Sequence, residues 1–95
     1  MFPKKRIPTH PGEVLLEEFL QPLGITQVAF AEPIGVPLQR VNEIVRGRRG
    51  VTPATAWLLA GALGTTPEFW INLQVAHDLA ASRPAKPVGR LKRTG

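Results

Sequence analysis

The 95-residue chain contains no cysteine and no tyrosine. Without cysteine, the chain cannot form disulfides, thiolate zinc sites or a cysteine nucleophile. Its histidines, His10 and His77, lie far apart in the sequence, and its single serine is Ser82. These side chains are too few for a histidine-rich metal cluster and offer little for acyl or phosphoryl transfer. We therefore expect no catalytic residues, no bound metal and no cofactor.

Long apolar runs are also missing. The longest apolar stretch, 57–63, is much too short to span a bilayer. Residues 8–13 are polar and proline-containing where a signal peptide would place its apolar region. We expect a soluble, cytoplasmic protein that does not contact a membrane. An apolar content of 43% in 95 residues suffices for one small domain.

The net charge of +5 is unevenly distributed along the chain. Residues 1–10, 36–50 and 83–95 are basic, whereas residues 11–35 are acidic. Such a basic surplus favours a polyanionic partner. The pattern predicts a basic N-terminal arm (1–8), a folded domain (9–82) and a basic tail (83–95), for which we expect disorder.

Prolines and glycines recur at intervals that mark helix ends, because helices favour proline in the first turn and glycine after the last. Three threonines precede three of the expected helices as N-caps. No segment alternates apolar and polar residues in the manner of a strand. The sequence therefore predicts an all-α domain of five short helices, over residues 11–21, 27–34, 37–46, 53–64 and 68–81.

Individual side chains add expectations at two helix ends. We expect Glu13 to reach back to a free N–H at the first helix terminus. Pro33 removes one hydrogen bond from the second helix and crowds the carbonyl of Ala29, so we expect a kink or an early end there. Trp57 is predicted to be a core or half-buried residue.

Residues 27–46 have the pattern of a helix-turn-helix unit. Ala31 is small enough for a second helix to approach closely, and Gly35 permits the positive φ of a sharp turn. Five apolar side chains provide buried anchors on both sides of that turn: Phe30, Ile34, Val36, Val41 and Ile44. A generic helical hairpin would meet only some of these constraints.

In a helix-turn-helix unit, the second helix lies in the DNA major groove with its N-terminal residues at the base edges. Gln39 can pair with adenine, Arg40 with guanine, and Leu38 can meet a thymine methyl group. Asn42 is as consistent with a surface or backbone-bonded role as with a base contact. The predicted base contacts are Leu38, Gln39, Arg40 and Glu43. The predicted phosphate contacts are Gln27, Arg46, Arg48 and Arg49.

The last helix carries a mostly apolar stripe at three- and four-residue steps. A domain this short is not expected to bury every large side chain, so Trp70 is a candidate for a self-association surface. Two-fold dimers suit DNA sites with two half-sites about one turn apart. The predicted homodimer interface consists of Trp70, Leu73, Ala76, His77 and Ala80.

Three segments of the chain resemble the HigA-type antitoxins, which belong to the xenobiotic-response-element class of helix-turn-helix domains related to phage repressors. The segments are His10-Pro11-Gly12-Glu13 with residues 17–24, residues 41–52, and residues 66–74. The resemblance covers residues 7–81. It implies a five-helix, phage-repressor-like fold and a dimeric antitoxin.

The resemblance also implies two partners. One is a HigB-type toxin, an mRNA endonuclease that the antitoxin neutralises, and the other is double-stranded operator DNA upstream of the antitoxin's own operon. On this basis Gln27, Leu38, Gln39, Arg40 and Glu43 are DNA-reading positions, with Arg46 and Arg49 on phosphates. No toxin-binding residues follow from the resemblance, although the acidic first helix suits a basic ribonuclease.

Other functions share parts of this pattern. A free-standing transcriptional repressor without a toxin would have the same fold and the same DNA face. A nuclease is disfavoured because Glu17 and Glu18 are adjacent and point to different sides of a helix. A non-specific nucleoid protein would bind without sequence preference, with an affinity that collapses as salt rises.

Overall fold

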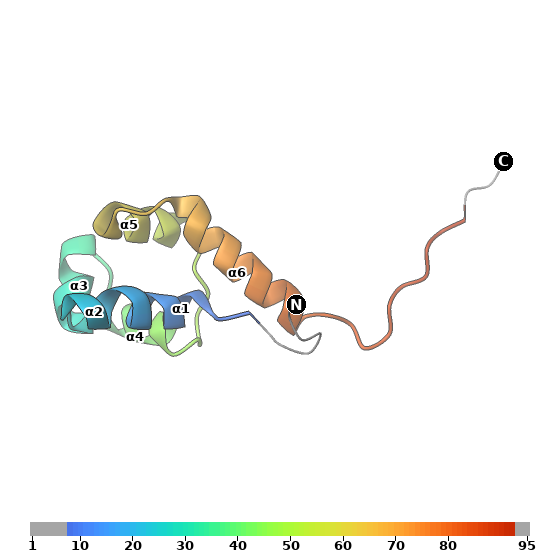
Figure 1. Cartoon of the computed structure of the whole chain (residues 1–95), viewed down its shortest axis with the longest axis horizontal. Helices are drawn as coiled ribbons and strands as arrows, with labels where there is room; N and C mark the ends of the chain where they lie inside the picture. Colours follow the sequence, from blue (N-terminus) through green and yellow to red (C-terminus); the bar gives the residue numbers. More distant parts are fainter. Residues whose placement is uncertain (1–7, 93–95) are drawn as a thin grey trace.

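The computed structural model describes residues 8–92, and every regular element in that range is helical. Figure 1 shows the helices packed around one core, with the segment after the last helix extending away from them. The elements are α1 (Pro11–Val14), η1 (Leu15–Leu20), α2 (Gln21–Leu23), α3 (Gln27–Ile34), α4 (Leu38–Val45), α5 (Pro53–Leu63) and α6 (Pro67–Ala81). Because α1, η1 and α2 are continuous, the described residues form five helices, which confirms the all-α prediction.

The two basic termini are described only in part. Residues 1–7 of the predicted arm and residues 93–95 of the predicted tail lie outside the described residues. From Arg83 to Lys92 the chain forms no helix or strand. Among the described residues, none of the helices combines the length and apolarity needed to cross a membrane.

The helix ends follow the threonine and glycine signals. Thr26, Thr52 and Thr66 each accept a hydrogen bond from the backbone N–H three residues later, as N-caps do. The first helix extends to Leu23 rather than Gln21, because Gly24, with φ of +66°, adopts the left-handed conformation that ends the helix. Observed and predicted ends therefore agree to within two residues.

The middle of the first helix is a π-helical turn, η1. The backbone N–H of Gln21 donates to the carbonyl of Leu16, five residues back. Five-residue spacing brings Leu15 and Leu20 onto the same side of the helix, where each is 1% exposed. The side-chain cap of this helix is His10, whose Nδ1 accepts the backbone N–H of Gly12 at 2.9 Å, and among the described residues the predicted hydrogen bond from a backbone N–H to Glu13 is not observed.

The burial of the two tryptophans is the reverse of what the sequence predicts. Trp70 is 0% exposed, packs against Phe19, and donates from its indole nitrogen to Thr65 Oγ1 at 2.7 Å. Its predicted place on a self-association surface is therefore wrong. Trp57 is 69% exposed rather than buried or half-buried, because α5 turns Ala56 and Leu59 towards the core.

Gln74 is a buried polar residue that joins α6 to the loop after α4. Its Oε1 accepts the backbone N–H of Val51 at 2.7 Å, and its Nε2 donates to Asp78 at 2.9 Å. Buried polar groups are tolerated when they are paired in this way. The amide thus fixes the end of the arginine-containing loop against α6.

Pro33 lies within α3, which continues to Ile34, so the predicted early end of this helix is wrong. Proline costs a helix most in the interior, where a hydrogen bond to the carbonyl four residues back is lost. Here that carbonyl belongs to Ala29, and both Ala29 and Pro33 are exposed. Water can therefore reach the carbonyl to which Pro33 cannot donate.

His10 and His77 meet where the chain enters α1. Their rings pack edge to face with centroids 4.9 Å apart. His77 Nδ1 lies 2.8 Å from the carbonyl oxygen of Pro8, which can only accept, so this nitrogen carries the proton. Burial and the neighbouring His77 lower the pKa of His10 below its ordinary value of 6.5, while Asp78 and Glu13 oppose that change.

This pKa shift predicts loss of stability in acid. Because the folded state favours neutral His10, the unfolded chain binds the proton first as pH falls. The contribution of neutral His10 to the free energy of unfolding is complete above pH about 6.5. It is lost as the pH falls below that value towards the pKa of His10 in the folded state. His10→Asn replaces the capping nitrogen Nδ1 by an amide oxygen that can accept the same N–H but does not titrate. Its melting temperature should therefore fall less between pH 7.5 and pH 5 than that of the wild type, as measured by circular dichroism. Equal falls in melting temperature for the wild type and the variant would show that protonation of His10 does not cause the loss of stability.

Candidate nucleic-acid interface

Helices α3 and α4 pack across a tight turn. Gly35 adopts φ of +70°, and the backbone N–H of Val36 donates to the carbonyl of Ala31 at 3.1 Å. Ala31 is buried at this close approach, as predicted. Phe30, Val36, Val41 and Ile44 are also buried, and Ile34 packs half-buried against them. The predicted helix-turn-helix packing is therefore confirmed.

The N-terminal turn of α4 is accessible from outside the molecule. Leu38, Gln39 and Arg40 are exposed there, while Val41 and Ile44 face the core. Asn42 and Glu43 are half-buried further along the helix. None of the described helices thus covers the predicted base-reading edge at Leu38, Gln39 and Arg40.

Three arginines follow the C-terminal end of α4, and two of them contact Glu43. Arg46, Arg48 and Arg49 are all exposed. Arg49 Nε lies 3.1 Å from Glu43 Oε1, and the backbone N–H groups of Arg48 and Arg49 donate to the Glu43 carbonyl. The sequence pattern assigns Glu43 to a base and Arg49 to a phosphate, but the structure places the two side chains together. Both side chains of the ion pair remain partly solvent-exposed, so the pair contributes little to stability.

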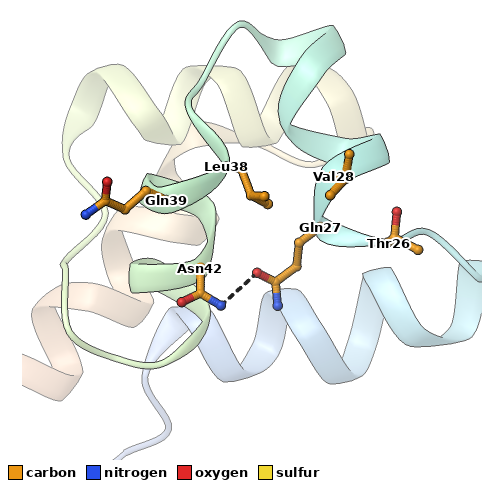
Figure 2. Close-up of a pocket in the computed structure, with 6 residues that line it drawn as sticks. All are labelled: Thr26, Gln27, Val28, Leu38, Gln39 and Asn42. Carbon is orange, nitrogen blue, oxygen red and sulfur yellow. Dashed lines mark hydrogen bonds between the residues drawn. The ribbon is translucent and has the colours of Figure 1, made fainter.

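A groove of about 610 Å³ separates the N-terminal turns of α3 and α4 (Figure 2). Asn42 Nδ2 donates to Gln27 Oε1 at 3.2 Å across this groove. The groove is lined by Thr26, Gln27, Val28, Leu38, Gln39 and Asn42. The sequence alone indicates no partner for Asn42 and does not single out Val28. The two amide residues are fifteen positions apart, so no local spacing rule pairs them.

The remaining residues of the predicted dimer interface differ in exposure. Ala76 is exposed, whereas Leu73, His77 and Ala80 are half-buried. Two larger apolar side chains of α6, Val75 and Leu79, are also exposed. Without Trp70, the helix therefore still presents an apolar surface.

Comparison with known proteins identifies the family. The helix-turn-helix family profile matches residues 16–70. Antitoxin HigA-1 of Vibrio cholerae serotype O1 is 50% identical over 80 residues, covering 83% of this chain and 74% of that protein. The structure also superposes on solved antitoxins bound to DNA, at amino-acid identities of 39% and 40%.

One of these structures is antitoxin GraA in complex with its operator, with a TM-score of 0.83, covering 98% of this chain and 100% of that one. The other is Pseudomonas aeruginosa antitoxin HigA with the higBA promoter, with a TM-score of 0.77 and coverage of 79% and 82%. From the exposed N-terminal turn of α4, the packing around Gly35 and these similarities, it follows that the chain belongs to the helix-turn-helix family and, within it, to the HigA-type antitoxins.

Proposed function

We propose that this protein is the antitoxin of a toxin–antitoxin pair and represses its own operon. It would neutralise a HigB-type mRNA endonuclease in the cytoplasm and bind operator DNA as a homodimer. The observation that carries the DNA-binding role is the uncovered N-terminal turn of α4, which presents Leu38, Gln39 and Arg40. In related folds, this turn enters the major groove.

Base reading in this proposal depends on the exposed side chains of the N-terminal turn of α4 and on half-buried Glu43 further along the helix. Gln39 can pair with adenine and Arg40 with guanine, each contributing about 1–3 kcal/mol of discrimination. Leu38 would contact a thymine methyl group. Glu43 can accept a hydrogen bond from cytosine once Arg49 moves to a phosphate.

Phosphate binding fits the exposed cations beside α4. Arg46, Arg48 and Arg49 outnumber the single carboxylate of Glu43, so this edge attracts the DNA backbone. Gln27 begins α3 and retains free N–H donors. These contacts would set the register of the protein on the duplex.

Substitutions separate base reading from phosphate binding. Gln39→Ala and Arg40→Ala should each reduce the preference for the upstream DNA over random DNA by about 5- to 150-fold. Arg46→Ala should weaken binding to both DNAs and reduce the slope of log affinity against log salt by about one. Mobility-shift titrations at two salt concentrations measure both effects. Equal losses on both DNAs for Gln39→Ala would contradict base reading, and an unchanged slope would contradict the phosphate contact.

The toxin-binding proposal is supported by the acidic first helix. Glu13, Glu17 and Glu18 are exposed there, and such a surface complements a basic ribonuclease. This is a binding role rather than an enzymatic one.

Purification of the native protein distinguishes the antitoxin from a free-standing repressor. A small basic partner retained through high salt supports the antitoxin, whereas a lone homodimer supports the repressor.

The proposed dimer interface on α6 consists of exposed Ala76 and the half-buried Leu73, His77 and Ala80. Removal of all residues after Gly64 would also remove buried Trp70, so truncation would test folding as well as association. Ala76→Glu changes an exposed position and should convert the dimer to a monomer, because an unpaired charge at the interface is costly. Light scattering measures this mass. Persistence of the dimer would place the interface elsewhere.

A further inference from the structure

The groove between α3 and α4 has one apolar side and one amide side. Val28 is 59% exposed and Leu38 46% exposed. Figure 2 shows their side chains directed towards the space between the two helices. Gln27 and Asn42 form the other side, and none of the described residues that line the groove is charged. The site therefore suits a ligand that combines a small apolar group with a hydrogen-bond acceptor.

The hydrogen bond between the two amides determines which atoms remain available. Gln27 Oε1 already accepts from Asn42 Nδ2, at 3.2 Å. The two N–H donors of Gln27 Nε2 are then left to face a ligand, since an amide has its donors and its acceptor on different atoms. Holding this side chain in place before binding also reduces the entropy lost on binding.

We propose that this groove receives one thymine nucleotide of the operator. Its C5-methyl group packs between Val28 and Leu38, and Gln27 Nε2 donates to a backbone phosphate oxygen beside that base. Asn42 is a positioning residue that holds Gln27. This inference rests on the proposed DNA-binding function and adds to it an apolar wall at Val28 and a role for Asn42.

Among the four bases, thymine presents a methyl group in the major groove. Cytosine presents an amino donor at the neighbouring position, for which Val28 and Leu38 offer no acceptor. The neutral lining also explains why the phosphate is met by an amide donor rather than by an ion pair. Thymine is therefore the base that matches the apolar wall, while the amide wall meets the phosphate beside it.

The test uses the full-length protein and the upstream site that it protects from nuclease digestion. Each thymine in that site is replaced singly by deoxyuridine, which removes only the methyl group. At one position in each half-site, wild-type binding should weaken about four-fold, the ratio expected for one buried methyl group. Val28→Ala and Leu38→Ala should remove that sensitivity. Val88→Ala, at a 91% exposed position outside the groove, is the matched control and should retain it.

Asn42 is tested by a double-mutant cycle with Gln27. If Asn42 acts by holding Gln27, then Gln27→Ala, Asn42→Ala and the double variant should weaken binding by the same factor. That factor should be equal on the upstream DNA and on random DNA, because phosphate contacts carry no sequence information. Additive losses would show that Asn42 acts independently of Gln27 and would overturn its positioning role.

The outcomes separate this inference from the proposed function. If the wild type prefers its upstream DNA but no deoxyuridine substitution weakens binding, the thymine site is wrong and the repressor function stands. The thymine site is also wrong if Val28→Ala leaves the deoxyuridine penalty unchanged. If the wild type shows no preference for its upstream DNA, both proposals fail.

Discussion

Gly12→Ala is expected to destabilise the fold by about 3 kcal/mol or more, at the upper end of overpacking costs. A Cβ atom at Gly12 would overlap the backbone carbonyl of Ile44 and would lie 3.0 Å from Val45 Cα. Backbone atoms cannot rotate away as a side-chain tip can, so α1 would have to separate from α4. Urea denaturation followed by circular dichroism measures this loss.

Gly61→Ala provides the matched control. Gly61 lies inside α5, and a Cβ atom there would meet no atom of the described residues within 4 Å. Alanine is the better helix former, so this variant should gain about 1 kcal/mol. Because α4 carries the proposed base-reading edge, Gly12→Ala should also weaken operator binding under conditions where Gly61→Ala does not. A Gly12→Ala protein as stable as the wild type would show that α1 and α4 do not pack this closely.

Trp70→Ala should cost about 3–5 kcal/mol, as expected when a buried tryptophan is truncated. The indole is fully buried, packs against Phe19 and Phe69, and donates to Thr65. Small domains have total stabilities of about 5–15 kcal/mol, so this loss would unfold a large share of the molecules. Denaturant titration of the variant measures the loss directly.

Trp57→Ala is the control with the same chemistry at an exposed site. It should change the free energy of unfolding by no more than about 0.5 kcal/mol, because surface substitutions away from special features have small effects. Similar losses for the two tryptophan variants would contradict the observed burial. The difference in stability between the two variants thus tests whether Trp70, which the sequence analysis placed on the surface, lies in the core.

The sequence predicted the helices well because their signals are local. Thr26, Thr52 and Thr66 bond to N–H groups only three residues away, and Gly35 needs its positive φ wherever the rest of the chain lies. The helix-turn-helix unit was predictable for the same reason, since its constraints lie within twenty residues. Local patterns therefore predicted both the fold and the exposed edge of α4.

The errors arise where tertiary packing decides. Residue type and apolar periodicity led to Trp57 being predicted as a core or half-buried residue and Trp70 as a surface residue, but the packing of α5 and α6 determines which one enters the core. The contact between Gln74 and Val51 spans 23 residues, and that between Asn42 and Gln27 spans fifteen. No spacing rule pairs amides over such separations. The candidate site was therefore predicted as a set of residues but not as a hydrogen-bonded arrangement.

The wide turn at Leu15–Leu20 affects how this part of the chain can be redesigned. A helical wheel drawn with regular α-helical spacing places Leu20 on a different face from Leu15, although both are buried. A polar residue introduced at position 20 on that basis would enter the core. Deletion of a single residue here would restore ordinary winding and leave Gln21–Leu23 in nearly the same orientation, because four residues of α-helix and five residues of the wide turn each cover about one full turn. Engineering of the N-terminal helix should therefore treat the stretches before and after this turn as two separate registers.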